Sequence, residues 1–409
     1  MISATRSSNE SVNANIVSLD VGTSSVRSLL FDGNFNHFGH LGNQQKYEID
    51  TTKDGGVEID PDLLLKLVIQ CLDVLHEQMA AGNLKASGVG ISAFWHCFLG
   101  LDQAGLPTTP IIHLFDTRSA PQAEELKEKL DAAWVHETTG CVLHTSYWPA
   151  KLLWLRQNHA DVFHRTARWV SFGDYLLRAL HGSAADSTSM VSATGLWDYS
   201  TNDFSIDLLK IIGIERNQLV SNDNLDKPVN KLKPEYASRW PLFDGIPWCP
   251  AYGDGACNSI GSGCTGPHRF ALMVGTSGAL RVTVKAPAVT IPKGIWCYRV
   301  TRDRFLLGGS LSNGGDVFRW VEKTFRLPED AESQIATRAP GAHGLTMLPY
   351  LAGERSPYWR PDLRAAITGM TLSTTPIEIL QVARESVSLR VRQIYDLLTE
   401  GFGPPAQVV

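Results

Sequence analysis

The sequence predicts an α/β protein built from two related halves, and three observations lead to this prediction. Residues 16–31 (IVSLDVGTSSVRSLLF) place a short Gly-containing turn between two β-rich runs. Residues 271–284 (ALMVGTSGALRVTV) repeat this arrangement with the same Val-Gly-Thr-Ser core. Residues 38–93 then alternate strand-like and helix-like patterns. An identical tetrapeptide in the same strand context indicates an internal repeat.

The first turn, Gly22-Thr23-Ser24, has the composition of a phosphate-binding loop. Such a turn can direct backbone N–H groups and hydroxyls into one concavity. Asp20 stands at its mouth, and a carboxylate suits a hydrated Mg²⁺ ion. An ordinary β-hairpin with a surface Asp explains this stretch equally well when it is taken alone.

The second turn, Gly275-Thr276-Ser277, has Met273 at the position that corresponds to Asp20. If both loops bind one polyphosphate, only the first loop offers a carboxylate for the metal.

The composition is that of a soluble globular protein. The 409 residues are 43% hydrophobic and 19% charged, a length that suggests two or more domains. A net charge of −5 gives no indication of nucleic-acid or anionic-membrane binding. The 7 cysteines include no CxxC pair, which favours a reducing compartment over disulfides or a zinc site. Without an apolar leader or a membrane-spanning run, we expect a cytoplasmic protein.

The first half has the pattern of a ribonuclease-H-like layer. Two strands at 16–31 are followed by a third strand within 38–48, a helix from Asp60-Pro61 to about residue 81, and a buried strand at 89–93. Ligands in α/β sheets tend to lie beyond the carboxyl ends of strands, where Trp95 and His96 fall. We therefore consider both as sugar contacts, with a packed core tryptophan and a hydrogen-bonded core histidine as the alternatives.

Asp116 and Arg118 follow a similar apolar run at 111–114. Asp116 suits sugar hydroxyls, and the Arg118 guanidinium suits an anionic substrate group. The alternative is a surface ion pair that contributes little energy.

Residues 121–182 are predicted to be mainly helical, and residues 186–195 (DSTSMVSATG) form either a helix start or a loop that lines a cleft. Pro and Gly become frequent at 241–255, which suggests a passage between domains. We therefore predict a disordered tail at 1–14, a first domain at 15–244 and a second domain at 245–409.

Asp254 opens a segment of small residues, 253–264 (GDGACNSIGSGC), that suits a closely packed helix. A helix N-cap is the simple interpretation of this residue. The functional interpretation makes Asp254 the general base that takes a proton from a substrate hydroxyl during phosphoryl transfer. Later in the chain, residues 306–320 contain two Gly-Gly pairs before a helix, and Thr375-Pro376 starts a long helix to about residue 400.

With these motifs in order, the chain resembles the FGGY family of carbohydrate kinases over roughly residues 15–400. The motifs that carry the resemblance are DVGTSSVR (20–27), WH (95–96), FDTR (115–118), DSTSMVSATGLWD (186–198), GDGACN (253–258), GTSG (275–278), SNGG (312–315) and LPYLAGERSPYW (348–359). Within the family, the segments at 254–258, 275–281 and 312–320 are most similar to gluconate kinases, with xylulose kinases as the rival.

The resemblance implies two actin-like, ribonuclease-H-like domains around a cleft, with sugar mostly on the first domain and ATP mostly on the second. It also implies that Asp254 is the catalytic base, that Asp20 acts near Mg²⁺, and that both Gly-Thr-Ser loops face the ATP phosphates. Asn258, in the same motif as Asp254, is expected on the substrate side.

Family members typically continue after the long helix into further strands and a Gly-Gly loop that holds adenosine. Here the chain ends at GFGPPAQVV, so the sequence predicts an incomplete second domain. A sheet that lacks strands would expose an edge, which makes a homodimer one expected assembly.

We therefore expect an ATP-dependent kinase of a sugar or sugar acid, gluconate preferred, with no nucleic-acid or membrane partner. A xylulose or other polyol kinase is the alternative within the family. A kinase-derived sugar-binding protein without ATP turnover, or an actin- or chaperone-like ATPase, are the alternatives from other classes.

Overall fold

The computed structural model describes residues 14–409, which form two compact units. Unit 1 contains the chain up to Ala132 together with Leu143–Cys257, and unit 2 contains Ala133–Val142 and Asn258–Val409. The division therefore lies later in the chain than the predicted boundary after residue 244, because residues 248–253 form a strand of the unit 1 sheet. The predicted N-terminal tail lies outside the described residues, apart from Ala14.

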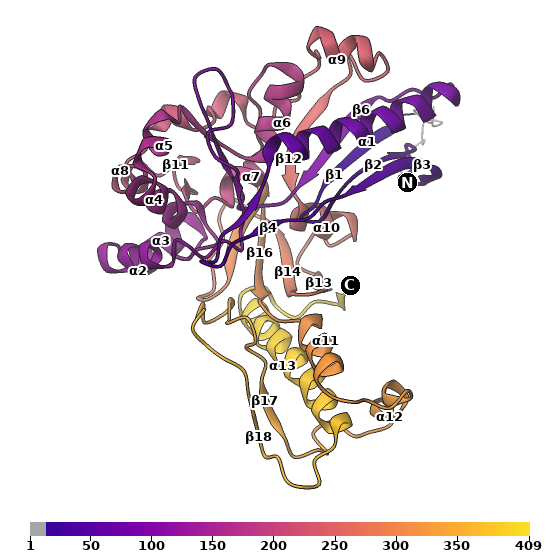
Figure 1. Cartoon of the computed structure of the whole chain (residues 1–409), viewed down its shortest axis with the longest axis vertical. Helices are drawn as coiled ribbons and strands as arrows, with labels where there is room; N and C mark the ends of the chain where they lie inside the picture. The colour runs from indigo at the N-terminus through magenta and orange to yellow at the C-terminus, as the bar shows by residue number, and fades with distance from the viewer. Residues whose placement is uncertain (1–13) are drawn as a thin grey trace, which may run out of the picture. The chain divides into compact units, whose positions relative to one another are not determined.

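The centre of unit 1 is a five-stranded sheet in the order β12-β6-β1-β2-β3 (Figure 1). Its strands are β1 (Ile16–Val21), β2 (Ser25–Phe31), β3 (His37–Lys46), β6 (Gly88–Ala93) and β12 (Trp248–Gly253). The first three strands are antiparallel, whereas β6 and β12 are parallel to β1 and to β6 respectively. This confirms the predicted ribonuclease-H-like layer.

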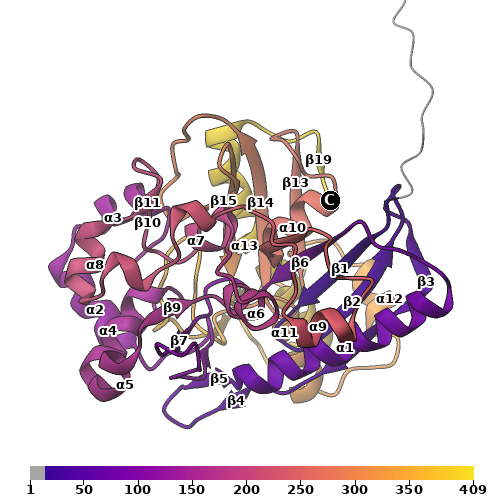
Figure 2. The same cartoon turned by 90° about the horizontal axis from the view of Figure 1, so that it is seen from above.

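Helix α1 (Pro61–Ala81) packs on β2 and β3, and Figure 2 shows it running beside them. It begins where predicted, because the Asp60 side chain accepts hydrogen bonds from the N–H groups of Asp62 and Leu63. Its predicted apolar face, which includes Leu64 and Val68, is fully buried. The helical spacing in the sequence thus identified part of the core of unit 1.

The alternation of side chains along β1 decides where Asp20 points. Val17, Leu19 and Val21 are completely buried, while Asp20 is on the opposite face and only half-buried. The strand therefore places a carboxylate outside the core, next to the turn that follows β1.

The other elements of unit 1 surround this sheet. They are β4 (Asp50–Thr51), β5 (Val57–Ile59), β7 (Leu99–Leu101), β8 (Ile111–Ile112), α2 (Ala120–Lys129), α4 (Trp148–Asn158), α5 (Ala160–Arg165), β9 (Arg168–Val170), α6 (Phe172–His181), α7 (Thr188–Ser192), β10 (Trp197–Asp198), β11 (Asp203–Phe204), α8 (Ile206–Ile212), η1 (Arg216–Gln218), η2 (Asn222–Asn224) and α9 (Pro234–Arg239). Helix α10 (Asp254–Gly261) follows β12 directly. The predicted helical character of residues 121–182 is confirmed, with the short strand β9 between α5 and α6.

Unit 2 repeats the strand order of unit 1. Its sheet runs β15-β16-β14-β13-β19, with antiparallel pairing from β15 to β13 and parallel pairing of β19 with β13. Thus β13, β14, β16 and β19 correspond in order and direction to β1, β2, β3 and β6. The internal repeat predicted from the Gly-Thr-Ser segments is confirmed in the topology.

The elements of unit 2 are α3 (Ala132–Thr139), β13 (Arg269–Val274), β14 (Gly278–Lys285), β15 (Trp296–Thr301), β16 (Arg304–Leu311), α11 (Gly315–Thr324), α12 (Ala331–Ala336), β17 (Thr346–Leu348), β18 (Ala366–Thr368), α13 (Pro376–Phe402) and β19 (Gln407–Val408). The start of α13 is fixed by a capping box between Thr375 and Glu378. The short strand β19 was not predicted, because so few residues carry no periodicity of their own.

All seven cysteines lie in the described part of the chain, and none of them forms a disulfide there. Among residues 14–409, no helix combines the length and the apolarity needed to cross a membrane.

Candidate functional site

The β1–β2 turn leaves several hydrogen-bond donors unused. The N–H of Gly22 donates to the Ser25 carbonyl at 3.0 Å, and Tyr47 donates to the Gly22 and Ser24 carbonyls from its hydroxyl (2.6 Å) and its N–H (3.2 Å). Within residues 14–409, neither the N–H groups nor the hydroxyls of Thr23 and Ser24 donate a hydrogen bond. The carbonyl groups of the turn thus accept the hydrogen bonds that stabilise it, and the donors of Thr23 and Ser24 remain available for an anion, as an anion-binding loop requires.

The β13–β14 turn is built in a similar way. Gly275 N–H donates to the Ser277 carbonyl at 2.8 Å, while Gly315 and Gly314 donate to the Gly275 and Thr276 carbonyls at 2.7 and 3.0 Å. A β-carbon on Gly315 would lie 2.7 Å from the Gly275 carbonyl oxygen, so this approach requires glycine. The second Gly-Gly pair noted in the sequence is therefore the surface against which this loop packs.

In unit 1, the carboxylates of Asp20 and Asp254 both lie near the thiol of Cys257. Burial raises the pKa of the Cys257 thiol to about 11. The negative charges of Asp254 and Asp20 also raise this pKa, whereas a hydrogen bond to Ser92 lowers it. Ser92 is also the β6 residue directly beside Asp20 on β1. Asp254 precedes Cys257 by three residues on α10, so the two side chains share one face of that helix, and both carboxylates therefore lie near this thiol.

Asp254 is the first residue of α10, and its side chain is exposed. Its Oδ1 accepts a hydrogen bond from the adjacent Gly255 N–H at 2.7 Å, whereas an N-cap side chain usually accepts from the N–H two or three residues on, so the N-cap interpretation stays a prediction. An exposed carboxylate can nevertheless also receive a proton from a substrate, so the two predicted roles are compatible.

The oxygen donors present fit Mg²⁺. The Asp20 side chain is half-buried and has no hydrogen bond or ion pair with any described residue. The described residues contain no group of three or more His, Cys, Asp or Glu side chains that could enclose a metal. Mg²⁺ suits this arrangement, since it is usually held by one or two carboxylates, water and substrate phosphates.

Trp95 is packed against the residue that precedes Asp254. A β-carbon on Gly253 would lie 1.8 Å from Trp95 Cε2, so the indole covers the Gly253 backbone. Ser189 connects the two, because its carbonyl accepts from Trp95 Nε1 (3.1 Å) and its hydroxyl accepts from Gly253 N–H (3.2 Å). Trp95 is only 5% exposed, so its buried ring supports this junction whether or not its edge also touches a sugar.

His96 is half-buried and has a left-handed backbone (φ 66°), which is unusual for a residue other than glycine. Its Nδ1 lies 2.7 Å from the Ala193 carbonyl, and its ring meets Tyr147 edge-on. If Nδ1 carries the proton, Nε2 of the neutral ring is an acceptor suited to a hydroxyl.

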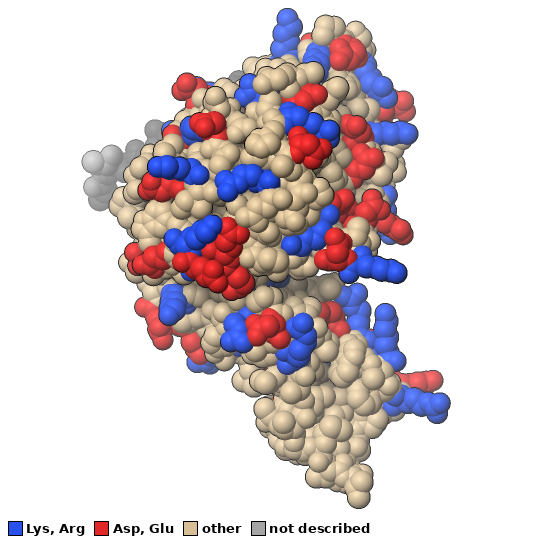
Figure 3. Space-filling model, turned by 60° about the vertical axis from the view of Figure 1, so that its left-hand side comes forward, with Lys and Arg blue, Asp and Glu red and all other residues tan. Residues whose placement is uncertain are grey.

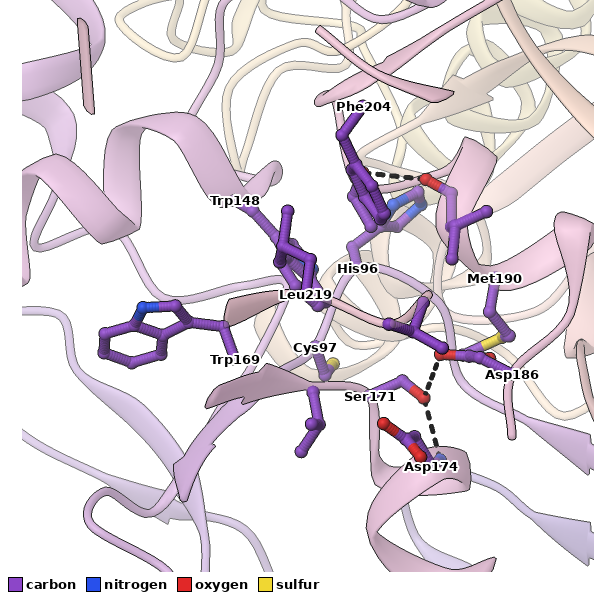
Figure 4. A pocket seen from close by; sticks show the side chains of 14 residues that line it. His96, Cys97, Trp148, Trp169, Ser171, Asp174, Asp186, Met190, Phe204 and Leu219 are labelled. Atoms are coloured by element: carbon purple, nitrogen blue, oxygen red, sulfur yellow. Dashed lines mark hydrogen bonds between the residues drawn. The ribbon is translucent and has the colours of Figure 1, made fainter. Parts of the chain in front are cut away.

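His96 also lines an enclosed cavity in unit 1, and Figure 4 shows that the hydroxyl of Ser171 there donates to the Asp186 carboxylate and accepts from the Asp174 backbone N–H. The cavity measures only about 10 Å³, the size of a single water molecule. It therefore cannot be the sugar site.

Asp116 and Arg118 form the ion pair that the alternative interpretation named, but the pair is not on the surface. Asp116 is 1% exposed and accepts from the Arg118 guanidinium and from the Val57 N–H (3.0 Å). Arg118 also bonds to Glu58 at 2.5 Å and lies 4.4 Å from the centre of the Trp154 ring. Contact of either residue with a sugar stays a prediction, since these charges already have partners.

Asn258 is exposed on α10 in unit 2, where its carbonyl accepts from the Ser262 N–H at 3.0 Å. Its side chain is therefore open to solvent, and its predicted substrate contact stays a prediction.

Three residues of these sites were missed by the sequence reasoning: Tyr47, Ser189 and Arg319. Arg319 of α11 donates to the Thr276 hydroxyl at 2.7 Å and so contacts the second loop. Ser189 belongs to the hydroxyl-rich segment that the sequence had marked, but nothing there distinguished it from its neighbours. Tyr47 carried no local pattern at all.

Comparison with known proteins identifies the family to which the chain belongs. Residues 15–261 match the N-terminal domain, and residues 270–409 the C-terminal domain, of the FGGY family of carbohydrate kinases. A gluconokinase of Bacillus subtilis is 27% identical over 95% of this chain and 78% of its own length. A xylulose kinase of Lactococcus lactis is 25% identical over 94% of this chain and 76% of its own length.

A solved structure gives the same result. The crystal structure of gluconate kinase from Lactobacillus acidophilus superposes with a TM-score of 0.89 at 26% identity, covering 97% of this chain and 80% of that protein. The matched domains together span nearly the whole described chain. The chain therefore belongs to the FGGY family of carbohydrate kinases.

Proposed function

We propose that this carbohydrate kinase transfers the γ-phosphoryl group of MgATP to a hydroxyl of a sugar or sugar acid, with gluconate as the preferred substrate, in the cytoplasm. The observation that carries the proposal is that two carboxylates, Asp20 and Asp254, lie near one thiol, that of Cys257. Phosphoryl transfer needs a metal site, a proton acceptor and donors around the phosphates, and little else from the protein.

Each part of the reaction has a residue in this chain. The substrate hydroxyl oxygen forms a bond to the γ-phosphorus, the bond from that phosphorus to the β–γ bridging oxygen breaks, and the hydroxyl proton passes to the Asp254 carboxylate. Mg²⁺, held through Asp20, would neutralise phosphate charge as the bridging bond breaks. The Gly22–Ser24 and Gly275–Ser277 loops each supply donors for phosphate oxygens.

On the substrate side, we propose that Trp95, His96 and Asn258 contact the sugar. We favour gluconate because two of the similar proteins are named gluconokinase and gluconate kinase. Xylulose is the second candidate, because a xylulose kinase matches at a similar identity.

The proposal is tested by ADP release with gluconate, xylulose or glycerol, beside a reaction without sugar. We expect release that depends on one sugar and that falls about 100- to 10,000-fold in Asp254→Ala, the range for loss of a general base. Asp207→Ala is the matched control, because Asp207 is also exposed in the first turn of a helix, α8.

Near-wild-type turnover in Asp254→Ala would contradict the base assignment. ADP release without any sugar would instead favour an ATPase, and sugar binding without release would favour the binding-protein alternative.

A further inference from the structure

Unit 1 contains a second polar pocket, which none of the candidate kinase residues lines. Its volume is about 670 Å³, within the usual range of sites for small molecules. The arginines Arg168 of β9, Arg178 of α6 and Arg216 of η1 all line it. Leu219 and Val220 form a wall that it shares with the small cavity beside His96.

The charge of this pocket is predominantly positive. Asp203 is the one acidic residue among those that line the pocket, and it is paired with Arg216, while Asp174, which is paired with Arg178, is fully buried. On the face of the molecule drawn in Figure 3, basic and acidic side chains are interspersed. Three arginines around one hollow are therefore a departure from the charge pattern seen on that face.

Two of the three arginines are held in place. Arg178 Nε donates to Asp174 Oδ1 at 3.0 Å. Arg216 Nε donates to Asp203 at 2.7 Å, and its guanidinium lies 4.8 Å from the centre of the Phe204 ring. Side chains that are already ordered lose little entropy when a ligand binds, so this site is pre-organised.

Much of the donor capacity of Arg168 and Arg178 is unused, whereas Arg216 also donates from its two Nη groups to the Val220 carbonyl (2.9 Å) and the Asn222 side chain (3.1 Å). Within residues 14–409, the only hydrogen bond of the Arg178 side chain is the one from Nε, which leaves both Nη groups without an acceptor. Arg168, which is exposed, makes a single long bond from Nη1 to the Asn217 carbonyl (3.4 Å). Planar guanidinium groups with open N–H pairs match the geometry of phosphate oxygens.

The rest of the lining suits hydroxyl groups. Asn217 and Asn224 line the pocket, and their side-chain amides bond to no other described residue. Each amide can both donate to and accept from a hydroxyl. An anionic group on the arginines with hydroxyls toward these amides would satisfy both parts of the pocket.

We propose that this pocket is a separate binding site for a phosphate group, carried on a sugar or polyol whose hydroxyls reach the asparagines. Free inorganic phosphate shares the chemistry that the arginines recognise, and the experiment distinguishes the two sources. The inference does not rest on the proposed kinase reaction, because binding is measured without ATP.

The test is isothermal titration calorimetry of the full chain with glucose 6-phosphate, inorganic phosphate and glucose, each in low-salt buffer. Arg168→Ala is the informative variant, since Arg168 makes one weak bond and its loss should not affect folding. Arg165→Ala is the matched control, because Arg165 is also exposed and donates one 3.4 Å bond to a carbonyl, that of Thr108, outside the pocket.

We expect both phosphate compounds to bind and glucose not to bind. The affinity should fall about 10-fold or more in Arg168→Ala, as expected for the loss of a charge-assisted contact, and should be unchanged in Arg165→Ala. Arg168→Glu, which reverses the charge, should abolish binding while circular dichroism shows an unchanged fold.

Tighter binding of glucose 6-phosphate than of phosphate would support the sugar phosphate as ligand, and equal binding would support the phosphate site with free phosphate as its source. Absence of binding at 10 mM of either compound, or equal affinities in Arg168→Ala and Arg165→Ala, would overturn the proposal.

Discussion

The indole of Trp95 covers the backbone of Gly253, the residue immediately before Asp254, so closely that a β-carbon there would lie 1.8 Å from Trp95 Cε2. Ser189 accepts hydrogen bonds from both residues and so stabilises this contact. The position of the proposed base therefore depends on a contact between the last residue of β12 and Trp95, the second residue after β6.

Gly253→Ala should displace either Trp95 or the start of α10. We expect the free energy of unfolding to fall by about 1–3 kcal/mol, the usual cost of overpacking. We also expect kcat to fall more than the KM for ATP rises, because the base moves while the phosphate loops do not. Steady-state kinetics and urea unfolding measure both quantities.

Gly90→Ala is the control for this variant, because Gly90 lies in the same sheet and a β-carbon there would meet no atom within 4 Å. If Gly253→Ala behaves like Gly90→Ala in both measurements, Trp95 does not constrain the position of Asp254.

Asp20→Asn should weaken magnesium binding without weakening the fold, because Asp20 has no side-chain partner among the described residues. We expect the Mg²⁺ concentration for half-maximal activity to rise roughly 10-fold or more, since a contact to a charged group contributes on the order of 1.5–3 kcal/mol. Titration of activity with Mg²⁺ measures this. Asp161→Asn, at an exposed Asp outside the proposed site, serves as control, and an equal Mg²⁺ requirement in both variants would argue against the metal role.

Arg118→Ala should mainly lower the free energy of unfolding. It leaves the Asp116 carboxylate buried without its cation, which typically costs about 3–5 kcal/mol. Because Arg118 is already bound to Asp116 and Glu58, we expect the KM of the folded enzyme for gluconate to change little. A large rise in this KM, with the KM for xylulose unchanged, would instead support the predicted contact with a substrate carboxylate.

Lys151 should make stability rise with pH. The side chain is completely buried, with its Nζ donating to the His113 carbonyl at 2.6 Å, and burial lowers its pKa from 10.5 to about 8. Between these two values the unfolded chain binds more protons than the folded one, so the free energy of unfolding increases by up to about 1.4 kcal/mol per pH unit.

This contribution is isolated by subtracting the unfolding free energies of Lys151→Met from those of the wild type, each measured in urea from pH 7 to 10.5. The subtraction removes most of the effect of the cysteines, which titrate in the same range. A difference that stays constant with pH would show that Lys151 is not titrating as its burial predicts.

The local elements of this protein were determined by the sequence by itself. The Gly-Thr-Ser turns, the start of α1 at Asp60-Pro61 and the start of α13 at Thr375-Pro376 all depend on a few neighbouring residues. Turn residues, caps and apolar periodicity act within one or two turns of backbone, so they can be recognised along the chain. The repeated turn was enough to indicate two related halves and to select Asp20 as a candidate ligand.

Only the tertiary structure decided which distant residues meet. It assigned β12 to the sheet of unit 1 and added β19 to that of unit 2. It also gave Arg118 two carboxylate partners, one of which, Glu58, no local pattern connects with it. Ser189, which joins Trp95 to Gly253, had no distinguishing neighbour in the sequence. These contacts arise when separate segments pack together, and their partners are chosen by the shape and polarity of the whole interior.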